Sequence, residues 1–133
     1  DDLTTPEEAA RFVKETGIDL LATAVGNLHG ILKNAPQPKL NIERIKEIKN
    51  NSGASLVLHG GSGISNYEFI LAIDAGISII HINTEIRLAW RKGMGIALKE
   101  KPEEIVPYKL LPLVVEEIRK TVYNRLKLFS KLN

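Results

Sequence analysis

Short apolar segments alternate along this chain with segments that have the spacing of amphipathic helices, and this alternation limits the fold more than any other feature. The apolar segments cover residues 20–25, 56–58 and 77–82. Their lengths fit strands buried on both faces better than helices. Because strands separated by helices pair in parallel, the pattern predicts an α/β fold. A parallel sheet normally has more strands, and this chain opens with a helix pattern, so we expect the later part of a barrel or of a doubly wound sheet.

Capping residues predict where the helices begin. Thr5, Pro6 and Glu8 match a capping box for a first helix, which is expected to end at Gly17. The predicted order is helix, strand, helix, strand, helix, strand, helix, helix. The residues expected to open or cap the later helices are Asn41, Ser65, Thr84 and Pro112.

Composition narrows the function classes. With 133 residues, of which 44% are hydrophobic and 26% charged, residues 1–133 are expected to form a single unit. The formal net charge is only +2, so we expect no nucleic-acid partner and no membrane partner. The sequence has no leader pattern and no long uncharged apolar stretch, which makes a cytoplasmic location the expectation. Because it has no Cys, any metal must bind nitrogen and oxygen ligands.

All three histidines of the sequence lie at or just past the end of an expected strand. They are His29, His59 and His81. In parallel α/β folds, ligand and catalytic groups collect at the carboxyl edge of the sheet. Neutral imidazole is a common metal ligand, so this placement indicates a metal site. The alternative is a set of histidines that bond only to the backbone.

A glycine-rich segment, residues 60–63, follows the second expected strand and precedes a capped helix. Such a backbone can approach an anion closely, and Ser62 adds a hydroxyl donor, so the segment could hold a phosphate or could be a flexible turn. After the third strand, Asn83 and Thr84 open another helix, which is the usual second part of a phosphate site in (β/α)8 barrels. Strand alternation also predicts that His81 and Asn83 project to one side of the sheet.

Three motifs in this order resemble the class II, zinc-dependent fructose-bisphosphate aldolases. They are AVGNLHG (24–30), LVLHGGSG (56–63) and INTEIRLA (82–89), and the opening segment TPEEAA (5–10) resembles the same family. The resemblance covers the chain but only the C-terminal half of the family's sequence. It implies the C-terminal part of a (β/α)8 TIM barrel, with about three parallel strands, flanking helices and a C-terminal helical extension. The implied reaction is the reversible cleavage of fructose 1,6-bisphosphate to dihydroxyacetone phosphate and glyceraldehyde 3-phosphate.

The resemblance also implies the roles of individual residues. His29 and His59 match two ligands of the family's zinc ion, which polarises the ketone. Backbone carbonyls near them resemble a site for a monovalent cation, Na⁺ or K⁺. The residues that match groups holding the phosphorylated ketose substrate are Gly30, Gly60, Ser62, Asn83 and Thr84.

Departures from the family pattern also matter. His81 stands where the family usually has an Asn that contacts the substrate, so we place it among the substrate-binding residues. Leu111 stands where a basic residue usually reaches the second phosphate, with Lys109 as a potential substitute. The third zinc-binding His and the proton-moving Asp belong to the half that is absent here. The general acid and base are therefore unknown in this chain, which alone is expected to be inactive. A homo-oligomer, dimer or tetramer, is implied for the complete enzyme.

Three alternatives remain open. A tagatose-bisphosphate aldolase is the nearest variant, although Gly61 and Asn83 favour fructose. The chain could instead be a noncatalytic phosphate- or metal-binding half-barrel that needs a partner, because an open parallel sheet leaves unpaired edges. Finally, His29, His59 and His81 could form a complete three-histidine metal site. Phe69 and Trp90 are expected to be core or interface residues in all of these cases.

Overall fold

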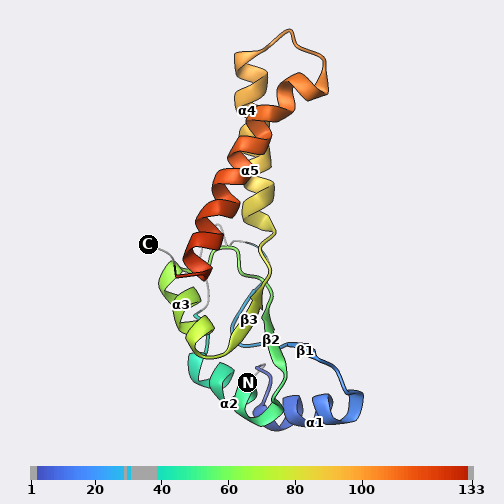
Figure 1. Ribbon diagram of the computed structural model, residues 1–133, viewed down its shortest axis with the longest axis vertical. Coiled ribbons are helices and arrows are strands. Elements are labelled where there is room, and N and C mark those ends of the chain that lie inside the picture. The colour runs from blue at the N-terminus through green and yellow to red at the C-terminus, as the bar shows by residue number, and fades with distance from the viewer. Residues whose placement is uncertain (1–2, 29, 31–38, 132–133) are drawn as a thin grey trace. The chain divides into compact units, whose positions relative to one another are not determined.

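A computed structural model describes residues 3–28, 30 and 39–131 (Figure 1). The helices and strands follow the predicted order. The chain forms two compact units, residues 1–82 and residues 83–133, each of which is described by itself. The elements of the first unit are α1 (Pro6–Thr16), β1 (Leu20–Ala22), α2 (Ile42–Ser52), β2 (Ser55–Leu58), α3 (Asn66–Asp74) and β3 (Ile77–Ile80). Those of the second unit are α4 (Thr84–Glu100) and α5 (Pro107–Phe129).

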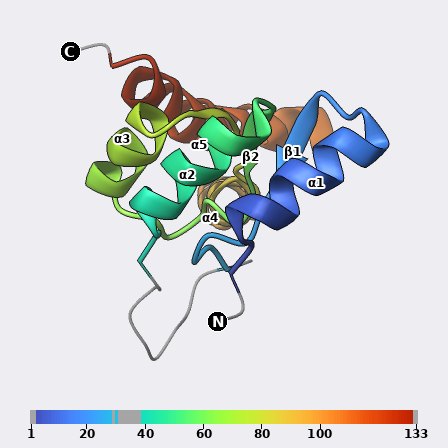
Figure 2. The same ribbon diagram turned by 90° about the horizontal axis from the view of Figure 1, so that it is seen from below.

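The sheet of the first unit has three parallel strands in the order β1-β2-β3. This confirms the predicted α/β class and the predicted parallel pairing. Because both crossovers contain a helix and run in the same direction along the sheet, α2 and α3 cover one face. Helix α1 lies beside α2, and α2 beside α3, as Figure 2 shows from below.

The core of the first unit surrounds β2, the central strand. Leu56 and Leu58 are almost completely buried, and Ile45 and Ile48 of α2 bury one side of their helix against the sheet. Phe69 of α3 is fully buried, as expected. The burial of consecutive residues on β2 explains why this strand appears in the sequence as a continuous apolar run rather than an alternating one.

The helix starts of the first unit agree with the predicted caps. Thr5 and Glu8 form the reciprocal capping box, and α1 ends at Gly17, which adopts the left-handed conformation. The side chains of Asn41 and Ser65 accept hydrogen bonds from the first turns of α2 and α3. Local side-chain chemistry therefore accounts for these boundaries.

Two strands are shorter than predicted, and the hydrogen bonds of the backbone show the reason for β1. β1 ends at Ala22, because the backbone of Ala24 bonds to Thr4 and that of Val25 bonds to Asn41 and to the side chain of Asn27. β3 ends at Ile80 rather than at residue 82. Neither His81 nor Asn83 lies within the strand, so the predicted projection of both side chains to one side stays a prediction.

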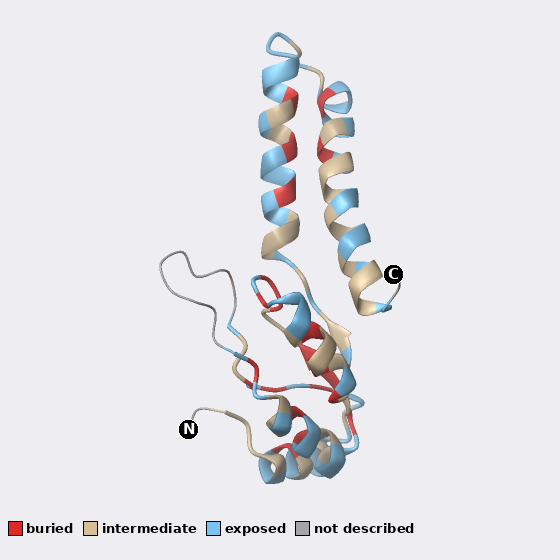
Figure 3. Ribbon diagram, turned by 90° about the vertical axis from the view of Figure 1, so that its left-hand side faces the viewer, coloured by how far each residue is buried: buried red, intermediate tan, exposed pale blue. Residues whose placement is uncertain are grey.

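The second unit is a pair of helices that pack through small residues. Ala89, Gly93 and Ala97 form the buried face of α4, and Leu110 and Val114 of α5 are buried (Figure 3). A Cβ atom added at Gly93 would lie 2.6 Å from the Cα atom of Val114. The two backbones can approach this closely only because residue 93 has no side chain.

In the second unit one predicted cap, at Thr84, and one predicted helix start, at Pro112, are wrong. Thr84 is the first residue of α4, the cap position belongs to Asn83, and no side-chain hydrogen bond caps the helix. Helix α5 begins at Pro107, so Pro112 lies inside it. Both prolines fit a helix start by local rules, but the earlier one occupies the first position, where a missing N–H has no consequence.

Within the described residues, no helix combines the length and the apolar character needed to span a bilayer.

Trp90, expected to be a core or interface residue, has 49% of its surface exposed in this chain.

Candidate functional site

The carboxyl edge of the sheet brings two of the three predicted histidines together. His59 directly follows β2, and His81 directly follows β3. The ladder continues one residue past β3, where the backbone N–H of His81 donates to the carbonyl oxygen of Leu58 over 3.0 Å. The imidazole centroids are 4.6 Å apart and the ring planes are nearly perpendicular, at 86°. Neighbouring parallel strands thus position two nitrogen-bearing side chains side by side.

A side-chain amide links the ends of β1 and β2. The Oδ1 atom of Asn27 accepts from the backbone N–H of Val25 over 3.0 Å. Its Nδ2 atom donates to the carbonyl oxygen of His59, also over 3.0 Å. No role was predicted for Asn27 from the sequence. The available signal was its place between the end of a strand and a predicted metal ligand, but its partner lies 32 residues away in the sequence.

His29, the other predicted metal ligand, lies outside the described residues, so its predicted role stays a prediction. The segments on both sides of the loop that contains it are closely connected. Asn41 donates its backbone N–H to the carbonyl oxygen of Val25 over 2.8 Å. A Cβ atom at Gly26 would lie 2.4 Å from the carbonyl oxygen of Lys39, so this contact requires glycine. Gly30 also has a positive φ, +96°.

Glu68 of α3 supports the same loop. Its Oε1 atom accepts from the backbone N–H of Leu40 over 3.1 Å, and its Oε2 atom accepts from the hydroxyl of Ser65. The predicted cap at Ser65 is therefore present. One oxygen of the Glu68 carboxylate bonds the hydroxyl of this cap residue, and the other bonds the backbone of Leu40.

The predicted phosphate segment forms a compact turn after His59. Gly60 and Gly63 have positive φ values of +64° and +94°, which favour glycine. A Cβ atom at Gly61 would lie 2.8 Å from the Cδ1 atom of Ile82, so the turn lies directly against the chain after β3. Ser62 has only 3% of its surface exposed. This geometry is more constrained than that of a flexible connection.

A cavity of about 410 Å³ opens at the carboxyl ends of β1 and β2. Asn27 and His59 line it, together with Ala22, Thr23 and Ala24. The described histidine with a predicted metal role therefore borders a space large enough for a small metabolite.

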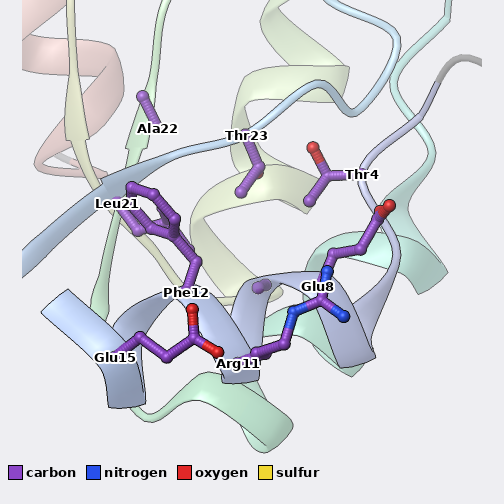
Figure 4. A pocket seen from close by; sticks show the side chains of 9 residues that line it. Thr4, Glu8, Arg11, Phe12, Glu15, Leu21, Ala22 and Thr23 are labelled. Atoms are coloured by element: carbon purple, nitrogen blue, oxygen red, sulfur yellow. The ribbon is translucent and has the colours of Figure 1, made fainter.

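A second cavity, of about 470 Å³, lies between α1 and β1 (Figure 4). Phe12 and Leu21 line it, and so do the charged residues Glu8, Arg11 and Glu15. The capping hydrogen bond from the backbone of Thr5 is the largest cause that lowers the pKa of Glu8. No predicted site residue lines this cavity.

The remaining predicted site residues, Asn83 and Thr84, open the second unit, and their predicted phosphate contacts stay predictions. Thr84 occupies the first turn of α4, where backbone N–H groups have no partner within the helix. In the same unit, the guanidinium of Arg125 donates two hydrogen bonds to the carboxylate of Glu85, over 2.6 and 2.7 Å, which makes a bidentate ion pair. This pair, which joins the start of α4 to the end of α5, was not predicted.

The residues at the sheet edge suit a metal only in part. Within residues 3–28, 30 and 39–131, no group of three His, Asp or Glu side chains could hold an ion. The two adjacent imidazoles nevertheless provide nitrogen donors of the type that zinc prefers. A metal at this edge would therefore need at least one ligand from outside the described residues.

Comparison with known proteins identifies the family of the chain. The family described as fructose-bisphosphate aldolase class-II matches residues 1–133. The "Probable fructose-bisphosphate aldolase" of Bacillus subtilis is 37% identical over 128 residues, which are 96% of this chain and 44% of that protein. The fructose-bisphosphate aldolase of Staphylococcus aureus is 38% identical over 128 residues, with the same two shares. The crystal structure of the YdjI aldolase from Escherichia coli K12 has a TM-score of 0.81 and 36% identity over 96% of this chain and 46% of that chain.

The chain spans less than half the length of these relatives. This coverage, together with the three-stranded parallel sheet, agrees with the predicted partial barrel. The predicted resemblance is confirmed, since the family matches the chain from end to end. The chain belongs to the class-II fructose-bisphosphate aldolase family.

Proposed function

We propose that this protein is a zinc-dependent aldolase that reversibly cleaves fructose 1,6-bisphosphate to dihydroxyacetone phosphate and glyceraldehyde 3-phosphate. The observation that carries the proposal is the segment His59–Gly63, in which an imidazole and a constrained glycine turn with a buried serine share one strand end. A metal ligand and a phosphate site next to each other suit a phosphorylated ketose. The family to which the chain belongs supports the same reaction.

His29 and His59 would hold the metal in this proposal. Zinc at that place would polarise the ketone carbonyl of the substrate. The third ligand and the group that moves the proton would come from sequence beyond these 133 residues, because relatives are more than twice as long. Residues 1–133 would thus act as one part of a barrel and be inactive alone.

The glycine turn would bind the phosphate of the dihydroxyacetone phosphate half. Gly60 and Ser62 would contribute N–H and O–H donors, and Asn83 and Thr84 would add the N-terminus of α4. Gly30 would contact the substrate from the loop after β1, and backbone carbonyls near His29 and His59 would hold Na⁺ or K⁺. A phosphate fixed at two loops would direct the ketose toward the metal.

His81 and Lys109 would determine how the rest of the substrate fits. His81 is exposed at the sheet edge, where its ring could meet the carbon chain of the ketose. The Nζ atom of Lys109 lies 3.1 Å from Glu104, so it would have to leave this ion pair to reach a second phosphate. Recognition of tagatose 1,6-bisphosphate is the alternative. A homo-oligomer, dimer or tetramer, is proposed for the complete enzyme.

A noncatalytic half-barrel is the second candidate function. Phe12 and Leu20 are about half exposed, at 50% and 52%, on α1 and on the outer strand β1. Apolar side chains at the edge of a parallel sheet favour a protein partner. Self-association without turnover would support this candidate.

A cleavage assay on the protein at its natural length tests the proposal. We expect turnover of fructose 1,6-bisphosphate that a chelator abolishes and zinc restores. His59→Ala should remove this turnover, whereas Asn51→Ala, the loss of a surface hydrogen bond on α2, should not. Turnover that resists the chelator in the wild type and in His59→Ala would overturn the proposal. Equal rates for tagatose and fructose bisphosphates would remove the substrate assignment alone.

A further inference from the structure

The side chain of Asn27 replaces the sheet hydrogen bonds that end before the site. The backbone ladder between β1 and β2 runs from Leu20–Ser55 to Ala22–Val57. Beyond it, Ala24 turns to Thr4 through two hydrogen bonds, so the β1 chain leaves its neighbour at the cavity. The carboxamide of Asn27 restores a connection there.

A carboxamide suits this role because it has the donor and the acceptor of a peptide group. Its acceptor binds the N–H of Val25 and its donor binds the carbonyl oxygen of His59. Val25 has only 1% of its surface exposed, so an unpaired N–H at this residue would be costly. The amide therefore joins a fixed buried residue to the backbone of His59.

We propose that Asn27 is a positioning residue for His59, and that it sets the direction of the His59 imidazole at the cavity. This inference rests on the proposed role of His59 as a metal ligand. A hydrogen bond to the carbonyl oxygen of a residue limits rotation of its peptide plane. It therefore also limits the direction in which the side chain leaves the backbone. The ring of His81 also packs edge to face against the same imidazole. Groups that orient a ligand in this way typically change metal affinity by roughly 10- to 100-fold when they are removed.

Cobalt binding to the protein at its natural length tests this role. Co²⁺ takes zinc sites and reports their geometry through its visible absorption. In Asn27→Ala we expect affinity for Co²⁺ to fall roughly 10- to 100-fold and the absorption bands to change in position or intensity. A residue that supported only folding would alter the amount of folded protein but not the spectrum of the folded fraction.

Asn27→Asp separates the two hydrogen bonds. The aspartate keeps an acceptor for Val25 but places a second oxygen against the carbonyl oxygen of His59, in place of the donor. We expect its cobalt spectrum to be altered, although its contact with Val25 is preserved. Because the contact with Val25 remains, Asn27→Asp tests the positioning role even if Asn27→Ala does not fold.

Asn41→Ala is the matched control, since it also removes an asparagine side-chain hydrogen bond in the first unit, at the cap of α2. Its affinity and its spectrum should equal those of the wild type. If His59→Ala loses Co²⁺ but both Asn27 variants keep the spectrum and the affinity of the wild type, the positioning role is overturned. Unchanged Co²⁺ binding in His59→Ala would instead overturn the proposed metal role itself.

Discussion

The imidazole rings of His59 and His81 meet edge to face, with centroids 4.6 Å apart, because the strands that precede them are paired at Leu58 and Ile80. Neither histidine lies in a strand, yet each follows one by a single residue. The register of β2 against β3 therefore places both rings at the same level of the sheet edge. Any group bound to one imidazole must fit against the other.

Replacing His81 tests whether its ring binds the metal or only lies against a ligand. We expect His81→Asn to keep the zinc stoichiometry of the wild type, because His29 and His59 are the proposed ligands. His81→Phe keeps an aromatic ring against His59 without a nitrogen ligand, so it should also keep zinc. Metal content by atomic absorption measures both variants. Loss of zinc in both would instead favour the three-histidine site.

Removing the hydroxyl of Ser62 should weaken binding of the phosphate. A hydrogen bond to a charged group contributes about 1.5–3 kcal/mol, so Ser62→Ala should lower affinity for dihydroxyacetone phosphate roughly 10- to 100-fold. Isothermal titration of the zinc-loaded protein measures this change. Ser78→Ala makes the same substitution at an exposed position of β3 and should leave affinity unchanged. Equal affinities in the two variants would contradict the phosphate role of Ser62.

Local sequence rules predicted those features that depend on neighbouring residues. The capping box of Thr5 and Glu8 and the position of His59 after an apolar run are both set within a few residues. Phe69 was correctly expected in the core or at an interface because it lies on an apolar helix face, whereas Trp90 remains half exposed in this chain.

Other features depend on contacts between distant segments, and local rules could not predict them. Asn27 bonds a carbonyl 32 residues away, and Glu85 bonds Arg125, which is 40 residues away. The start of α5 was also predicted wrongly. Pro107 and Pro112 fit the same local rule, and only the structure shows that Pro107 begins the helix. The predicted ligand His29 lies outside the described residues, so its place in the site stays a prediction.

Two glycines of α4 should respond in opposite ways to the same substitution. A Cβ atom at Gly93 would lie 2.6 Å from the Cα atom of Val114, so Gly93→Ala must push the helices apart. We expect it to reduce the free energy of unfolding by about 1–3 kcal/mol. Nothing lies within 4 Å of a Cβ atom at Gly95, where alanine should stabilise the helix by about 1 kcal/mol. Thermal or urea denaturation compares the variants, and a shift of the same sign in both would contradict this packing.

The capping box of α1 should make stability depend on pH through Glu8. The hydrogen bond from the backbone of Thr5, followed by that from its side chain, holds the pKa of this carboxyl below its ordinary value of 4.5. A carboxylate whose pKa is lower in the folded state stabilises the fold above its unfolded pKa, and this contribution disappears as the pH falls through the folded pKa. Glu8→Gln should therefore be less stable than the wild type near neutral pH, and the difference should shrink as the pH falls below 4.5.

Urea denaturation between pH 7 and pH 3 measures the difference between wild type and Glu8→Gln. The effect should be small and should decrease with added salt, because the carboxylate is exposed to solvent. Glu7→Gln is the control, since Glu7 is also in the first turn of α1 but is not part of the capping box. Like Glu8→Gln, it removes one negative charge near the helix N-terminus, so it measures the general effect of such a charge. The free energy of unfolding of each variant, relative to the wild type, is compared across the pH range. If this difference depends on pH in the same way for Glu7→Gln and Glu8→Gln, the helix dipole rather than the capping box explains the effect of Glu8.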